Sequence, residues 1–112
     1  MKTKVTDAGP VRVLALEGKL LLGNGDGDLE KAMNALLTEG HKKIVVDTAG
    51  VSQLDSGGLG AMVAYCFKRA KDKQATVRLV IPGNTRINLA AQTCLGLLFE
   101  LHDNETSAIA SL

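Results

Sequence analysis

The chain has no tryptophan and only three other aromatic residues, one tyrosine and two phenylalanines, among its 112 residues. Its core must therefore be mainly aliphatic. No apolar run approaches the roughly 18 residues that span a bilayer, so we expect no membrane insertion. An excess of one charge is also missing, because 13 basic and 12 acidic residues leave a formal net charge of +1. This balance predicts neither a nucleic-acid partner nor binding to anionic lipid.

Cysteine and histidine are scarce, with two of each. Cys66 and Cys94 fall on the apolar faces of two expected helices, so we predict buried thiols in a reducing compartment and no disulfide. The scattered spacing of the four residues matches no zinc site. Residues 1–7 lack the apolar segment of a signal peptide, so we expect a cytoplasmic protein. The length suits a single domain over residues 1–112.

Apolar periodicity and turn residues predict an α/β fold with the element order β-β-α-β-α-β-α-β-α. Three right-handed crossovers make most of the sheet parallel, and the first hairpin adds an antiparallel strand. We therefore expect a mixed, mostly parallel sheet of four to five strands with interleaved helices. The expected strands begin at Val5 and cover 11–17, 43–47, 77–81 and 97–101. The expected helices begin at Asp26 or Asp28, at Asp55 or Ser56, at Thr85, and at Asp103 or Asn104, and the first three end at Gly40, about Asp72 and Gly96.

Three loops come after parallel strands of this expected sheet, at Gly23–Asp28, Asp47–Ser56 and Pro82–Thr85. The carboxyl ends of parallel strands lie at one edge of a sheet, where ligands and partners usually bind. We therefore expect the three loops to cluster at one end of the domain.

The first of these loops is rich in glycine and aspartate. Asn24, Asp26 and Asp28 have the first three spacings of a calcium-binding loop, but Leu29 and Ala35 occupy the places of its glycine and glutamate. Helix capping explains the acidic residues better. No Gly-Lys-Ser/Thr comes after the glycines, so a phosphate-binding loop is not expected either. The sequence predicts neither a metal nor a cofactor.

The stretch Gln53–Gly60 places a serine between an aspartate and two glycines. An expected buried strand leads into it, so Asp55 or Ser56 occupies the N-cap position of the next helix. The glycines leave little bulk over the serine. The helix carries apolar residues on one face, at Leu59, Met62, Val63, Cys66, Phe67 and Ala70.

Ser56 has three interpretations. As a plain helix cap it would contribute about 1 kcal/mol. As a nucleophile it needs a histidine within hydrogen-bond reach, but His41 is expected at the opposite end of the sheet and nothing in the sequence orients His102. A small serine enzyme is therefore a remote alternative. As a phosphoacceptor Ser56 needs only exposure, because another protein supplies the chemistry.

The chain resembles the STAS domain, and within that family it looks most like the bacterial anti-sigma factor antagonists. The similarity covers nearly the whole chain and includes Gly18, the Leu36-Leu37 pair and residues 96–99. The residues that carry it are Ile44-Val45-Val46-Asp47, Val51 and Leu54-Asp55-Ser56-x-Gly58-Leu59-Gly60.

The resemblance implies a non-enzymatic protein that works by partner switching. In this family the unphosphorylated protein binds an anti-sigma factor that is also a serine kinase, and a sigma factor is released. The kinase then phosphorylates the serine after the motif aspartate, which is Ser56 here, and a serine phosphatase removes the phosphate. A phosphorylation-independent scaffold or accessory subunit of a signalling or transport complex is the alternative. The implied partner-binding residues are Asn24, Asp26, Leu54, Asp55, Ser56, Gly57, Gly58 and Leu59.

Two positions depart from the family pattern. Members often carry a second hydroxyl residue where Gly57 stands, so Ser56 is the one phosphosite that the resemblance implies. Many members have an acidic or polar residue where Leu21 stands, and Asp26 or Asp28 can substitute for it. Both departures bear on the choice of partner.

Overall fold

The computed structural model describes residues 1–112 and contains one five-stranded sheet in the order β1-β2-β3-β4-β5. β1 is antiparallel to β2, and every other neighbouring pair is parallel. The predicted α/β fold with a mixed, mostly parallel sheet is confirmed. The strands are β1 (Lys2–Ala8), β2 (Val11–Leu20), β3 (Lys43–Leu54), β4 (Thr76–Val80) and β5 (Leu101–His102). The helical segments are α1 (Asp26–Thr38), α2 (Ser56–Ala61), η1 (Met62–Lys68), α3 (Arg69–Asp72), α4 (Leu89–Leu98) and α5 (Glu105–Ala110).

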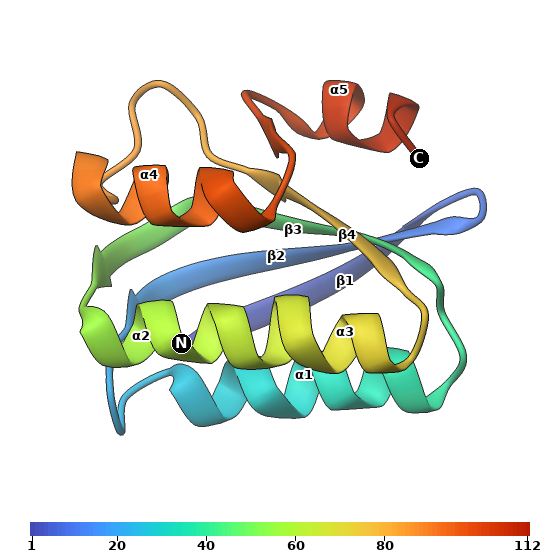
Figure 1. The fold of residues 1–112 in the computed structure, drawn as a ribbon, viewed down its shortest axis with the longest axis horizontal. Helices are drawn as coiled ribbons and strands as arrows, with labels where there is room; N and C mark the ends of the chain where they lie inside the picture. The colour runs from blue at the N-terminus through green and yellow to red at the C-terminus, as the bar shows by residue number, and fades with distance from the viewer.

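Helices pack against both faces of the sheet (Figure 1). The segments α2, η1 and α3 form one continuous helix, which lies beside α1. α4 shares the core of these helices, and the Phe67 ring of η1 meets the Phe99 ring after α4 edge to face, with 5.6 Å between centroids. α5 packs against Val45 and Val80 in a separate cluster. None of the helices is long and apolar enough to cross a membrane.

The first three strands are longer than the sequence pattern predicts, and the expected loop Asp47–Ser56 is wrong. β3 continues through that segment, and its end pairs with the end of β2 after a shift in register. Gly50 permits this pairing, because a Cβ there would lie 2.7 Å from the carbonyl oxygen of Leu16. β1 likewise begins at Lys2 rather than Val5. The added strand length carries the chain directly to the start of α2.

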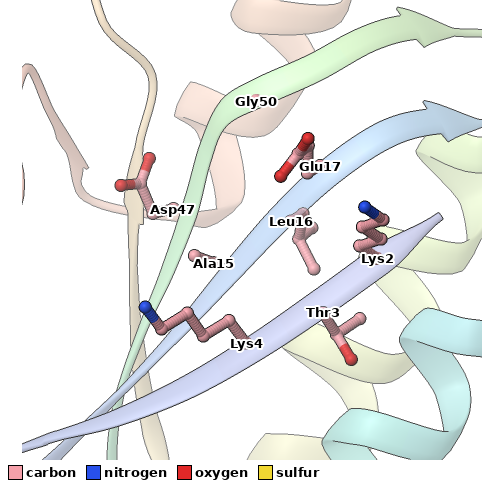
Figure 2. A pocket seen from close by; sticks show the side chains of 8 residues that line it. All are labelled: Lys2, Thr3, Lys4, Ala15, Leu16, Glu17, Asp47 and Gly50. Atoms are coloured by element: carbon pink, nitrogen blue, oxygen red, sulfur yellow. The ribbon is translucent and has the colours of Figure 1, made fainter.

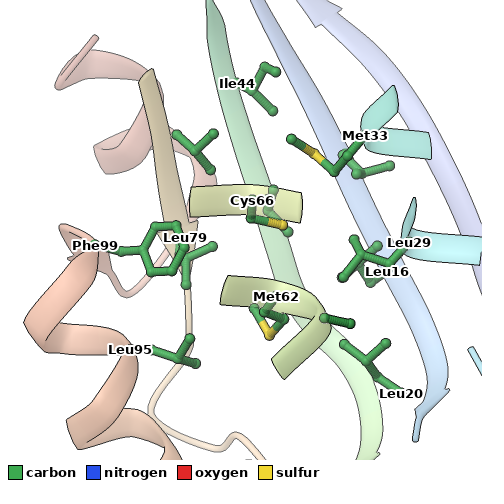
Figure 3. Packing of buried hydrophobic residues seen from close by; sticks show 14 of the residues in the cluster. Leu16, Leu20, Leu29, Met33, Ile44, Met62, Cys66, Leu79, Leu95 and Phe99 are labelled. Atoms are coloured by element: carbon green, nitrogen blue, oxygen red, sulfur yellow. The ribbon is translucent and has the colours of Figure 1, made fainter. Parts of the chain in front are cut away.

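Each face of the sheet has its own aliphatic core. β2 alternates between them, with Val11 and Val13 on the α5 side and Leu14 and Leu16 on the side of α1 and η1. This is the period-two pattern of a strand that is buried on both faces. Figure 3 shows the larger core, in which Met62 of η1 packs over the strands.

The start of α1 differs from the prediction. Neither expected aspartate is the N-cap: Gly25 occupies that position in a left-handed conformation, with no side-chain cap. The Asp26 carboxylate instead accepts hydrogen bonds from the backbone N–H groups of Gly23 and Gly27. The predicted end is confirmed, since Gly40 comes just after the last turn with a φ of +88°.

The region from Thr85 to His102 differs most. Asn88, not Thr85, caps α4, because its Oδ1 accepts from the N–H of Ala91 at 2.8 Å. The Thr85 hydroxyl accepts from Ile87 N–H and forms a separate turn. α4 also continues past Gly96 to Leu98, which leaves only two residues for β5. At the last helix Asn104 is the cap, one of the two residues predicted.

The two cysteines are both free thiols, but only one is buried. Burial raises the pKa of the Cys66 thiol to about 12, so it stays protonated. Cys94 is partly exposed, and the prediction that it is buried is wrong. The reason is that α4 buries only a narrow stripe, through Ala91 and Leu95, and Cys94 lies at the edge of that stripe.

Candidate functional site

The aspartate of the Asp-Ser-Gly-Gly turn caps α2. Asp55 Oδ1 accepts a hydrogen bond from Gly58 N–H at 2.8 Å. Ser56 is the first helical residue and is exposed. The interpretation of Ser56 as the helix cap is therefore wrong, and its hydroxyl is left without a partner in the chain.

The same carboxylate holds the loop between β2 and α1. Leu22 N–H lies 3.1 Å from Oδ1 and 3.2 Å from Oδ2 of Asp55. The hydrogen bonds from Gly58, the largest contribution, and from Leu22 lower the pKa of Asp55, against an opposing effect of desolvation. Asp55 therefore stays ionised next to Ser56 at neutral pH.

Both glycines after Ser56 are required by this close approach. A Cβ at Gly57 would lie 2.4 Å from Cβ and 2.9 Å from Cα of Leu22. A Cβ at Gly58 would lie 1.9 Å from the carbonyl oxygen of Leu20. The departure at Gly57 from the family pattern thus has a local cause, because a hydroxyl residue there would displace Leu22.

The loop itself is a tight turn. Leu21 and Asn24 exchange backbone hydrogen bonds of 2.8 and 3.0 Å, and Gly23 has a φ of +72°. Asn24 is exposed and Asp26 is partly buried. Through the Leu22–Asp55 contact, the structure brings the loop that carries them to the serine turn, as the sequence predicted for these two loops.

The third loop does not line the hollow beside Ser56, but it does lie against part of the expected loop Asp47–Ser56. Asn84 and Arg86, near Pro82–Thr85, face Gly50 and Val51 of β3 across an open hollow of about 490 Å³. The next segment of the chain, the first turn of α4, reaches Ser56 instead. It lines a hollow of about 250 Å³ beside the serine, with Leu54, Leu59, Ala90 and Ala91 as apolar walls and Asp55, Ser56 and Asn88 as polar groups.

Sequence reasoning missed the part that α4 plays in this site. It placed the start of the helix at Thr85, whereas the helix begins after Asn88 and presents the exposed Ala90 beside the serine. The signal that was available is Asn88, a strong N-cap residue with a run of helix formers after it.

Neither histidine contacts Ser56. His41 Nε2 lies 3.2 Å from Glu39. His102 lies between Glu100, at 2.8 Å from Nε2, and the Ser107 hydroxyl, at 2.7 Å from Nδ1. The expectation that nothing orients His102 is therefore wrong, but its partners lie just before β5 and in α5, not at the serine turn.

Another hollow, of about 410 Å³, lies over β1, β2 and β3 and does not include the serine turn. Figure 2 shows Lys4 extended across the strands toward Asp47, with Glu17 near Gly50. This hollow is lined by small residues such as Ala15 and by side chains of both charges. No group of three or more His, Cys, Asp or Glu side chains is placed to hold a metal ion.

Comparisons with known proteins give one matching family model and several solved structures of similar fold. The family model of the STAS domain matches residues 2–108. An anti-sigma factor antagonist from Mycobacterium paratuberculosis is 23% identical, with a TM-score of 0.80 over 98% of this chain and 92% of that one. The anti-sigma factor antagonist SpoIIAA in its unphosphorylated form is 12% identical, with a TM-score of 0.72 over 98% and 96%. Phosphorylated SpoIIAA from Bacillus is 17% identical, with a TM-score of 0.69 over 98% of both chains. A search of curated proteins finds no significant match.

Proposed function

The chain belongs to the STAS domain family, and from this membership we propose that it is an anti-sigma factor antagonist that works by partner switching. Its unphosphorylated form binds an anti-sigma factor with serine kinase activity, and a sigma factor is released. The kinase phosphorylates Ser56, which ends the complex, and a serine phosphatase restores binding. These partners place the protein in the cytoplasm.

The observation that carries the proposal is the state of Ser56. Its hydroxyl is exposed at the first position of α2 and free of internal hydrogen bonds, because Asp55 performs the capping. The likeness to SpoIIAA supports the same assignment, since that antagonist has both a phosphorylated and an unphosphorylated form. If a serine capped the helix, its phosphorylation would break the capping hydrogen bond. Ser56 makes no such bond, so its phosphorylation leaves the cap intact.

The position of Ser56 also explains how a phosphate can switch binding without unfolding the domain. A phosphate adds about −1.5 to −2 charges, which the N-terminal end of a helix tolerates. In a packed interface, however, the same group meets the ionised Asp55 and must lose its water. A loss of about 3 kcal/mol of binding free energy at this interface weakens binding roughly a hundredfold.

The proposed partner surface contains the eight residues that the family resemblance implies. Asn24 and Asp26 lie on the β2–α1 loop, which Leu22 ties to Asp55. Leu54 to Leu59 form the serine turn and the start of α2. One hydrogen-bonded unit thus carries the whole surface, so a partner meets it already assembled.

The test is a pull-down from the native cytosol with wild type, Ser56→Asp and Ser56→Ala, followed by addition of ATP and Mg²⁺ and mapping of phosphosites. We expect wild type and Ser56→Ala to capture one serine kinase and Ser56→Asp to capture none. On addition of ATP, wild type should gain one phosphate at Ser56 and dissociate, while Ser56→Ala stays bound. Capture of the same partners by all three forms, with Ser56 unmodified, would instead show a phosphorylation-independent scaffold.

A further inference from the structure

We infer that the hollow between α2 and α4 is a socket for one apolar side chain of the anti-sigma partner, and that a phosphate on Ser56 closes it. The inference rests on the proposed function and adds α4 to the binding surface. The socket is the hollow of about 250 Å³ whose walls are Leu54, Leu59, Ala90 and Ala91. Pockets for small ligands occupy roughly 300–1,000 Å³, so its size favours a single side chain over a free ligand.

Two of the most exposed large apolar side chains lie on segments that border this socket, although neither of them lines it. Leu22 is 76% exposed and lies against Gly57. Leu89 is also 76% exposed and begins the turn of α4 that lines the socket. Single exposed leucines are ordinary, but two beside one hollow indicate an interaction site. An apolar anchor in a pocket, surrounded by further contacts that exclude water, is the usual centre of a protein interface.

The charges around the socket indicate which side chains the partner carries beside the apolar one. Asp55 borders it, and Asp26 lies on the first turn of α1, next to the Leu22 loop. The nearby Asp28 is already paired with the N-terminal ammonium of Met1 at 3.3 Å. No basic side chain lines the socket. A partner complementary to this surface presents an apolar side chain flanked by lysine or arginine.

Ser56 lines the socket, and this gives the switch a second physical basis. A phosphate there brings a hydrated dianion to the edge of an apolar wall. An apolar side chain then cannot enter without stripping water from that dianion, which is strongly unfavourable. The phosphate therefore opposes entry of the apolar side chain through its hydration as well as by repulsion.

The test uses the kinase that the pull-down recovers, purified, with dissociation constants measured by calorimetry. Ala90→Leu fills the socket from α4 without changing Ser56 or any charge, and Ala110→Leu, at an exposed alanine of α5, is its matched control. We expect Ala90→Leu to weaken binding at least tenfold and Ala110→Leu to bind as wild type does. Circular dichroism and thermal melting check that both variants remain folded.

A second pair of variants, at Ser56, separates the effect of side-chain bulk on binding from the effect of charge. Ser56→Leu fills the socket with a neutral group, whereas Ser56→Ala removes the hydroxyl and leaves the socket open. We expect Ser56→Leu to bind the kinase at least tenfold more weakly than Ser56→Ala, because the two variants differ only in the apolar bulk at position 56. Wild-type binding of both Ala90→Leu and Ser56→Leu, with loss only in Ser56→Asp, would overturn the socket and leave the proposed function standing. Failure of wild type to recover any kinase would overturn the proposed function and, with it, the socket.

Discussion

The backbone N–H of Leu22 donates to the carboxylate of Asp55 across 33 positions of sequence. Asp55 also caps α2 through Gly58. One side chain therefore starts the helix that presents Ser56 and holds the β2–α1 loop against that helix. Loss of this carboxylate should therefore destabilise both the start of α2 and the β2–α1 loop.

Asp55→Ala should destabilise the domain by about 1 kcal/mol, the usual effect of losing an N-cap side chain, and should also release Leu22. The free energy of unfolding in urea measures the first effect, and amide hydrogen exchange at Leu22 measures the second. Asp103→Ala is the matched control, because Asp103 is exposed and Asn104 performs the capping of α5. Equal stability of the two variants would contradict the role given to Asp55.

Gly57→Ala and Gly60→Ala should have opposite effects on stability, although both glycines lie in α2. Replacing a helical glycine by alanine stabilises by up to about 1 kcal/mol, and at Gly60 nothing lies within 4 Å of the new Cβ. At Gly57 the Cβ meets Leu22 at 2.4 Å, so the loop must move. Thermal melting shows whether each variant is more or less stable than wild type. If both were more stable, the β2–α1 loop would move away from the new Cβ without cost.

Glu105→Gln should change how stability depends on pH. A hydrogen bond with Asp47, together with desolvation and the charge of Asp47, raises the pKa of Glu105 to about 7 from its ordinary 4.5. The folded protein thus binds this proton more tightly than the unfolded chain does. The resulting stabilisation is complete below about pH 4.5 and is lost as the pH rises through 7.

The measurement is the free energy of unfolding of wild type and Glu105→Gln across that range. We expect the wild type to lose stability relative to the variant as the pH rises. Asp47→Asn removes the other half of the pair and should flatten the same dependence. Parallel curves for wild type and Glu105→Gln would contradict the raised pKa of Glu105.

Met62→Ala should destabilise the domain by roughly 2–5 kcal/mol, as for other large-to-small changes in a packed core. Met62 is fully buried within the larger core (Figure 3). Leu97→Ala removes an apolar side chain of similar size from a position that is 82% exposed, so its effect should stay within about 0.5 kcal/mol. Urea denaturation compares the two, and similar values would mean that the core does not depend on η1.

Much of the fold was predictable because local patterns carry it. The apolar spacing from Leu59 to Ala70 predicted the long helix, and the residues of β2 predicted a strand. Gly40 predicted the end of α1, since a left-handed residue there favours glycine. One of the errors falls where two nearby residues, Thr85 and Asn88, can each start a helix. The choice between them depended on packing.

For the candidate site, the sequence by itself determined which residues are present: a serine after an aspartate, two glycines, and a helix leaving the turn. It also determined the family, because that motif is specific in its β-α context. Tertiary structure alone decided that Leu22 bonds to Asp55 and lies against Gly57, and that α4 forms one wall beside the serine. The reason is physical. Hydrogen bonds and steric contacts between segments more than about 30 residues apart leave no periodic trace in a single chain, so only the folded backbone brings their atoms within reach.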